Sequence, residues 1–381
     1  MIEYIYTLTE TKYKFLKGNH HMNSHKVKKQ AVLDDATLNY VIIIMAFIVA
    51  LIIFTAVYLT VGFITAENAP ILDQSTKLPG QSSENATYPF RQNISLDISY
   101  DTENAESITN INAPNAVLID VTDGKIVAGK SSGGEISPAS MTKVMALIVV
   151  IENLQNENSL NDLVTVTEDH ISHKKSDRKL SGELGNSAYP AGQYTVKTLL
   201  HHMILDSSGV AALALADYIA GSEANFVKLM NDKAAEMGLE RTSFVYCDGS
   251  HALGHKSTCR DMAKIMAYAM KNTFCADVLT ALSYTDTNGT IYNKPLVHTY
   301  YQQNSNHNEI SPSNADIIAA KTGWTGDHAD GWSGGCLVSY AEGDNGHKYV
   351  VVVAHVPGVN YSTAIATAVQ DSVAICNNYI K

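Results

Sequence analysis

The hydrophobic pattern of the chain begins with one long apolar run. No charged residue occurs from Tyr40 to Ile64, and the run consists mainly of Ile, Val, Leu, Phe and Ala. About 20 apolar residues in a helix span the hydrocarbon core of a membrane, whereas the apolar part of a secretory signal has roughly 7–15. The length therefore predicts an uncleaved transmembrane anchor over residues 40–64, with cleavage among the small residues 65–69 as the alternative.

The charges on either side of this run predict its orientation. Lysines are frequent between Lys12 and Lys29, whereas Glu67 and Asp73 are the first charged residues after the run. Positively charged flanks stay on the cytoplasmic side of a membrane. We therefore expect residues 1–39 to form a cytoplasmic tail of a single-pass protein of the cell membrane, and everything after the anchor to be extracytoplasmic.

The next segment, residues 65–112, is rich in Asn, Ser, Thr, Glu and Asp and has no sustained periodicity. A composition of this kind buries too little apolar surface to offset the entropy of ordering the chain. The sequence therefore predicts a flexible stalk over residues 65–112, followed by a folded domain over residues 113–381.

Within that domain, alternating and helical patterns follow one another. Two strand-like runs flank Thr122-Asp123-Gly124, and Asp-Gly between apolar runs indicates a hairpin. Further elements are expected as a helix from Pro138 to about Leu154, helices between Thr195 and Met237 interrupted at 206–209 and 220–221, strands at 335–339 and 348–354, and a final helix from about Ser362. The pattern predicts an α+β domain in which helices pack on an antiparallel sheet.

Composition narrows the functional classes. The chain has 381 residues, 27 basic and 38 acidic side chains and a formal charge of −11, which argues against a nucleic-acid binder with a cationic face. Its five cysteines cannot all pair within one chain, and none form a CxxC zinc motif. We expect isolated core thiols and no metal or cofactor, with a Cys247–Cys259 bridge as the alternative.

The first candidate for chemistry is Ser140-Met-Thr-Lys143. This is one of three Ser-x-x-Lys matches, but the other two, Ser172/Lys175 and Ser176/Lys179, lie in a highly polar run. Ser140 instead stands at the start of an apolar helix, where spacing i,i+3 places the hydroxyl and the amine on one face. A partly desolvated lysine with a lowered pKa can accept the proton of a nucleophilic serine. The alternative is that Ser140 only caps the helix.

The second candidate is Lys321-Thr322-Gly323, which occurs once and follows an apolar run. At the end of a strand, an amine and a hydroxyl can bind a carboxylate, and glycine leaves room for a substrate backbone. Thr-Gly also occurs in ordinary turns, so the two motifs support each other more than either does alone.

Together these motifs resemble a known family. Ser-x-x-Lys, a serine-centred turn and Lys-Thr-Gly follow in the order found in penicillin-binding proteins and serine β-lactamases. Finer matches resemble the D-alanyl-D-alanine carboxypeptidases of peptidase family S11, which are low-molecular-mass penicillin-binding proteins. These matches are Ser137–Lys143, Ala214–Ser222, Gly254–Asp261 and Lys321–Thr325, within a resemblance over residues 113–381.

The resemblance implies a β-lactamase/DD-peptidase-like fold, with an antiparallel sheet flanked by helices and a helical subdomain. It implies that Ser140 is acylated, Lys143 is its base and Ser207 relays a proton to the leaving amine. Substrate binding would fall to Lys321, Thr322, Gly323 and Trp324, with the N–H groups of Ser140 and Trp324 as the oxyanion hole. The implied partners are peptidoglycan stem peptides ending in D-Ala-D-Ala and, as covalent inhibitors, β-lactam antibiotics.

Two departures from the family pattern keep alternatives open. The middle motif, Ser-x-Asn in the family, reads Ser207-Ser208-Gly209, and there is no Arg from Val350 to Asn378 where many relatives have one. One alternative is therefore a catalytically weak wall-peptide or penicillin-binding protein, for which Gly209→Asn should raise the rate. Another is a β-lactamase, for which Glu183 is the candidate deacylating residue.

Overall fold

The computed structural model describes residues 90–171, 190–286, 289, 291–292, 310–326 and 334–381. The predicted tail, the predicted anchor and residues 65–89 of the predicted stalk lie outside this part of the chain. Among the described residues, no helix combines the length and the apolarity that a membrane crossing requires.

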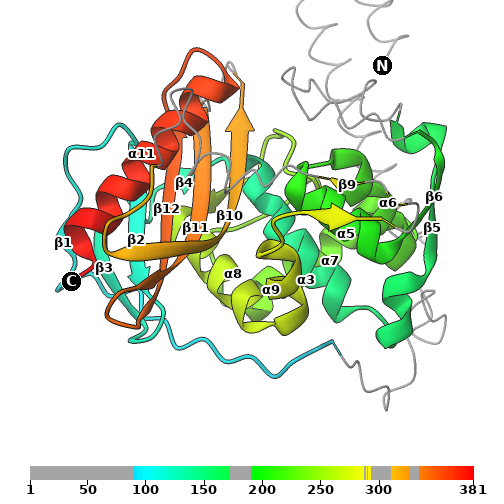
Figure 1. Cartoon of the computed structure of the whole chain (residues 1–381), viewed down its shortest axis with the longest axis horizontal. Helices are drawn as coiled ribbons and strands as arrows, with labels where there is room; N and C mark the ends of the chain where they lie inside the picture. Colours follow the sequence, from blue (N-terminus) through cyan, green and yellow to red (C-terminus); the bar gives the residue numbers. More distant parts are fainter. Residues whose placement is uncertain (1–89, 172–189, 287–288, 290, 293–309, 327–333) are drawn as a thin grey trace, which may run out of the picture. The chain divides into compact units, whose positions relative to one another are not determined.

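A six-stranded sheet, with strand order β1-β3-β2-β12-β11-β10, forms one side of the domain (Figure 1). All neighbouring strands are antiparallel except β1 and β3. Its strands are β1 (Glu106–Ser107), β2 (Asn115–Asp120), β3 (Lys125–Lys130), β10 (Ala315–Thr325), β11 (Gly334–Gly343) and β12 (Lys348–Val356). The predicted hairpin at Asp123-Gly124 and both predicted later strands are confirmed, and Gly124 has the positive φ of +66° that its turn requires.

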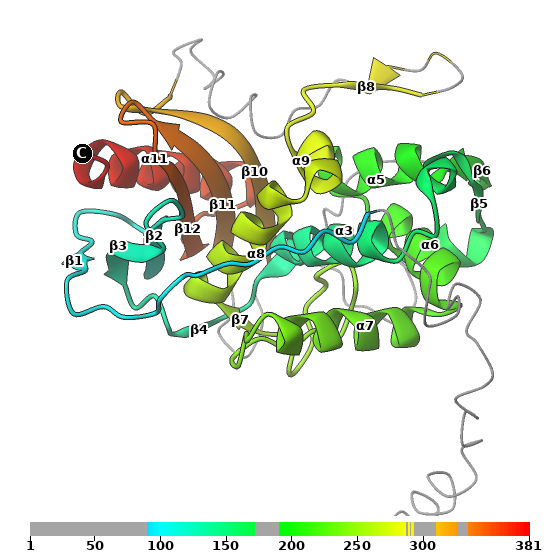
Figure 2. The ribbon, with the colours of Figure 1, turned by 90° about the horizontal axis from the view of Figure 1, so that it is seen from below.

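Helices cover both faces of this sheet (Figures 1 and 2). Alternate residues of one strand point to opposite faces, so Val350 and Val352 join a core with the central helices, whereas Val351 and Val353 pack against α11.

The helices are α3 (Lys143–Glu152), α5 (Val196–Leu205), α6 (Gly209–Ala220), α7 (Glu223–Glu236), α8 (Cys259–Lys271), α9 (Thr273–Leu279) and α11 (Tyr361–Tyr379), with 3₁₀ helices η1 (Ala139–Thr142) and η2 (Glu157–Asn161). Two-stranded sheets pair β4 (Glu135–Ile136) with β7 (Ser257–Thr258), β5 (Leu163–Val166) with β6 (Gly192–Thr195), and β8 (Tyr284–Thr285) with β9 (Ile291–Tyr292). The result is the mixed arrangement of sheet and helices that the sequence predicted.

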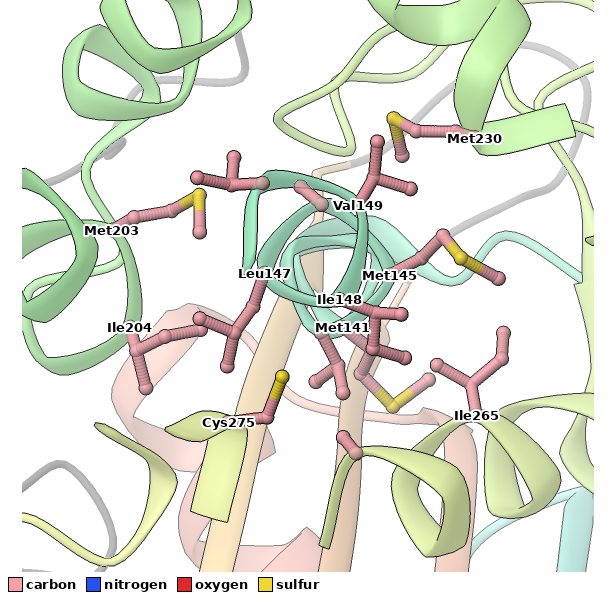
Figure 3. Packing of buried hydrophobic residues seen from close by; sticks show 14 of the residues in the cluster. Met141, Met145, Leu147, Ile148, Val149, Met203, Ile204, Met230, Ile265 and Cys275 are labelled. Atoms are coloured by element: carbon pink, nitrogen blue, oxygen red, sulfur yellow. The ribbon is translucent and has the colours of Figure 1, made fainter. Parts of the chain in front are cut away.

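Helix α3 is buried on every side. All its residues from Lys143 to Glu152 are buried, as expected for a helix that is apolar all round. Figure 3 shows its side chains surrounded by residues of other helices, among them Met203 of α5, Met230 of α7 and Ile265 of α8. The helix therefore has little freedom to shift relative to its neighbours.

Serine caps and glycines with positive φ mark the boundaries of α6 and α7. Ser208 and Ser222 accept hydrogen bonds from backbone N–H groups in the first turns of α6 and α7, which stabilises a helix by about 1 kcal/mol each. Gly221 and Gly238 have positive φ and follow α6 and α7. The breaks predicted at 206–209 and 220–221 are confirmed.

The structure differs from the predicted stalk at residues 90–112. Phe90 is fully buried, contacts the ring of Phe274 edge to face, and accepts a hydrogen bond at its carbonyl from Asn272. Ile98 and Ile108 are also buried. These few apolar residues are spaced along a polar segment, so they anchor it to the domain although its overall composition resembles that of a disordered linker.

The five cysteines are buried free thiols, as predicted. Burial raises the pKa of the Cys259 and Cys275 thiols well above the ordinary value. The alternative of a Cys247–Cys259 bridge is wrong.

Candidate active site

Ser140 lies in η1, immediately before the central helix. Its side chain is buried, with 8% of the residue exposed. The preceding residue, Ala139, has a φ of +47°, in the left-handed region that non-glycine residues rarely adopt. Such strain persists only where the surrounding structure enforces it, and it is found preferentially at functional sites.

The amine of Lys143 contacts the hydroxyl of Ser140. Lys143 is the first residue of α3 and is fully buried. Its Nζ donates a hydrogen bond to Ser140 Oγ at 3.0 Å and another to the carbonyl of Asp248 at 2.5 Å. The i,i+3 spacing therefore brings together a hydroxyl and the amine that could accept its proton.

Ser207 and Lys321 form the second contact of the site. Ser207 stands between α5 and α6 with a φ of +55°, a second strained position. Lys321 on β10 donates from Nζ to Ser207 Oγ at 2.9 Å and to the carbonyl of Thr322 at 2.9 Å. Burial, together with the nearby charge of Lys143, lowers the pKa of Lys321 well below its usual 10.5. A carboxylate bound at Lys321 would oppose both effects.

Strand β10 packs directly on the turn that bears Ser140. A Cβ placed on Gly323 would lie 3.0 Å from Pro138 O, 3.1 Å from Ala139 Cβ and 3.2 Å from Ser140 N. These separations are shorter than ordinary contacts, so a side chain does not fit there without displacement. The glycine of Lys-Thr-Gly thus lets the strand approach the serine.

Thr322 and Trp324 lie beside Tyr361, a residue that the sequence reasoning missed. The hydroxyl of Tyr361 is 3.4 Å from Thr322 Oγ1, and its ring meets that of Trp324 edge to face. Tyr361 is the first residue of α11. No local motif distinguishes it, because its proximity to Thr322 depends on how α11 packs across the sheet.

A second residue missed from the sequence is Asp248. Its backbone carbonyl accepts a hydrogen bond from Lys143, and its side chain is buried next to Gly209. The structure places the predicted site residues close to Asp248 and the end of β10. They are Ser140, Lys143, Ser207, Lys321, Thr322, Gly323 and Trp324. Glu183, the candidate for a β-lactamase, lies outside the described residues.

One group of three side chains within the described residues has metal-ligand chemistry. Asp120, Asp123 and His347 could each offer one ligand atom near the β2–β3 turn. The ammonium group of Lys125 already contacts Asp123 Oδ2 at 2.5 Å. Its charge opposes a cation at that position.

Comparison with known proteins identifies the family. The model of peptidase family S11, described as D-alanyl-D-alanine carboxypeptidase, matches residues 102–357. The chain belongs to this family.

Individual relatives agree with this assignment. The chain is 32% identical to the D-alanyl-D-alanine carboxypeptidase DacF of Bacillus subtilis, over 63% of this chain and 57% of the relative. It is 37% identical to DacC of Escherichia coli over 39% of this chain and 36% of the relative. The chain thus spans about half or less of the length of these curated relatives.

Solved structures support the fold. Penicillin binding protein 5 of Haemophilus influenzae matches with a TM-score of 0.57 and 22% identity, over 72% of this chain and 71% of that chain. A DD-transpeptidase of Streptomyces K15 matches with a TM-score of 0.56 and 24% identity, over 71% of this chain and 98% of that chain. The S11 domain described here therefore has a DD-peptidase-like fold.

Proposed function

We propose that this S11 protein is a serine-type D-alanyl-D-alanine carboxypeptidase that trims peptidoglycan stem peptides. The observation that supports this most directly is the 3.0 Å hydrogen bond between Lys143 Nζ and Ser140 Oγ, next to the Lys321–Ser207 contact. Family membership and the names of the relatives point to the same reaction.

In the first step, Ser140 Oγ attacks the carbonyl carbon of the penultimate D-alanine while its proton passes to the neutral amine of Lys143. The backbone N–H groups of Ser140 and Trp324 stabilise the resulting oxyanion, and loss of one such donor costs about 3–4 kcal/mol in comparable sites. The C–N bond then breaks, and the leaving D-alanine receives a proton through Ser207. Water hydrolyses the Ser140 ester and releases the shortened peptide.

Substrate recognition falls to the strand edge. Lys321 and Thr322 bind the terminal carboxylate of the peptide, and the same contacts would bind the carboxylate of a β-lactam. Gly323 and Trp324 border the substrate backbone. Burial lowers the pKa of Lys321, so a bound carboxylate would restore its ammonium form.

Labelling with a fluorescent penicillin tests the nucleophile. The wild-type protein should form a stable covalent adduct, and Ser140→Ala should form none. Ser132→Ala is a matched control, because Ser132 is also a buried serine but contacts Arg260 rather than the site. Absence of label in the wild type would reject the proposal.

Release of D-alanine from a D-Ala-D-Ala peptide then separates the alternatives. Measurable turnover that requires Ser140 supports a carboxypeptidase, whereas binding without release would indicate the catalytically weak wall-peptide binder. Rapid destruction of penicillin in place of a stable adduct would indicate a β-lactamase.

We also propose that residues 40–64 anchor the protein in the cell membrane with the catalytic domain outside. The uncharged length and the preceding lysines support this topology. Protease added to intact cells should degrade the domain while the tail, residues 1–39, stays protected. Protection of both parts would reject the topology.

A further inference from the structure

The turn Asp248–Ser250 borders two parts of the candidate active site at once. The carbonyl of Asp248 accepts a hydrogen bond from Lys143 Nζ at 2.5 Å. Gly249 has a φ of +83°, and a Cβ there would lie 2.0 Å from Ala139 O and 3.0 Å from Ser140 N. The turn therefore packs against the backbone of the nucleophile and holds the amine of its base.

The side chain of Asp248 extends from this turn to a third part, the start of α6. A Cβ placed on Gly209 would lie 2.9 Å from Asp248 Oδ2 and 3.6 Å from Asp248 Cβ. Asp248 is only 1% exposed. The Asp248 carboxylate accepts two hydrogen bonds from Ser250. The Ser250 N–H donates to Asp248 Oδ1 at 3.0 Å, and the Ser250 hydroxyl donates to Asp248 Oδ2 at 2.9 Å. The carboxylate is thus fixed in the space that a side chain at position 209 would occupy.

We propose that Asp248 and Gly209 act as a pair, in which the aspartate takes the place of a side chain at position 209 and positions Lys143 beside Ser140. This inference rests on the proposed function. Asp248 is a positioning residue here, since its contacts reach the substrate only through Lys143. The pairing explains why position 209 is glycine although it lies two residues after Ser207.

The pairing reverses one expectation from the sequence. Read by family pattern alone, Gly209→Asn restores a missing residue and should raise the rate. In this structure an asparagine at 209 would collide with Asp248 Oδ2, so the same substitution should lower the rate.

A double-mutant cycle tests the pair. Gly209→Asn, Asp248→Ser and the combined variant are compared with the wild type in the rate of acylation by a fluorescent penicillin. We expect each single variant to lose at least tenfold, and the combined variant to recover at least tenfold over Gly209→Asn, because serine vacates the space. Additive losses, or a faster Gly209→Asn enzyme, would overturn the pairing.

Thermal unfolding of the same four proteins measures the packing without any turnover. The midpoint of Gly209→Asn should rise when Asp248→Ser is added. If the wild type is not labelled by penicillin at all, the proposed function fails, yet the unfolding cycle still decides whether positions 209 and 248 are coupled.

Asp248→Asn tests whether the shape of the side chain is sufficient, because it keeps the acceptor for the Ser250 N–H. It should be acylated within threefold of the wild-type rate, whereas Asp248→Ser loses at least tenfold. Asp232→Asn, an exposed position on α7, is the matched control and should also keep the wild-type rate. A tenfold loss in Asp248→Asn would overturn the positioning role of this side chain's shape.

Discussion

Replacing Gly323 with alanine tests how closely β10 must approach the nucleophile. The added Cβ would lie 3.0–3.2 Å from Pro138 O, Ala139 Cβ and Ser140 N, where ordinary contacts measure 3.4–4 Å. The strand and the turn must therefore separate by about 0.2–0.4 Å, since atoms at contact distance resist further approach steeply.

The size of the effect follows from this displacement. A misplacement of 1 Å can cost about 100-fold in rate, so a third of that distance predicts a loss of roughly fivefold. Overpacking of this kind also lowers the free energy of unfolding by about 1–3 kcal/mol. The predicted change is therefore a several-fold slower enzyme that is still folded.

The assay is the second-order rate of acylation by a fluorescent penicillin, measured on samples whose thermal unfolding confirms the native fold. Gly192→Ala is the matched control, because its Cβ would have only ordinary contacts, at 3.7 Å or more. Equal acylation rates for Gly323→Ala and the wild type would refute the argument that β10 must touch the serine turn.

Three further predictions concern other contacts of the domain. Tyr361→Phe removes a hydroxyl from the carboxylate end of the site, so KM for a D-Ala-D-Ala peptide should rise about fivefold, equivalent to ~1 kcal/mol, with kcat unchanged in steady-state kinetics. Lys233→Met removes the only ammonium group that contacts the buried Glu152 carboxylate among the described residues, at 2.8 Å, and leaves it the Tyr268 hydroxyl. Because the remaining charge is buried without an opposite charge, urea unfolding should show a loss of about 3–5 kcal/mol. Binding of a carboxylate ligand to Ser140→Ala should take up a proton, because the pKa of Lys321 is lowered in the free protein. The affinity for the ligand should therefore fall as pH rises through that pKa. Calorimetry in two buffers with different heats of ionisation measures the proton uptake.

Each of these predictions has an outcome that contradicts it. An unchanged KM would remove Tyr361 from the substrate contacts. A loss below about 1 kcal/mol for Lys233→Met would mean that Glu152 is solvated, whereas adding Glu152→Leu should restore most of the stability if the pair is buried. Equal heats of binding in the two buffers would mean that binding takes up no proton and that Lys321 keeps the same protonation state in the free and bound protein.

Local patterns in the sequence were sufficient for much of the fold. Asp123-Gly124 predicted the first hairpin, and the interruptions at 206–209 and 220–221 predicted where α6 begins and ends, because turns and helix boundaries depend on residues a few positions apart. The same holds for Ser140 and Lys143, whose contact needs only one turn of backbone.

Contacts between distant segments could not be predicted in this way. The position of Asp248 against Gly209 joins residues 39 positions apart, and Tyr361 reaches Thr322 only because α11 crosses the sheet. Composition places segment 90–112 in the predicted stalk for the same reason, since Phe90 is held by Asn272 and Phe274 at the start of α9, far away in the sequence.

The burial of α3 links antibiotic binding to the integrity of the whole domain. Ser140 immediately precedes α3, which contacts α5, α7 and α8, so α3 can open only if these helices separate from it. Amide protons of α3 should then exchange only through global opening. The extent of covalent penicillin labelling would accordingly measure the fraction of folded protein. Loss of labelling on heating would coincide with the cooperative unfolding of the domain.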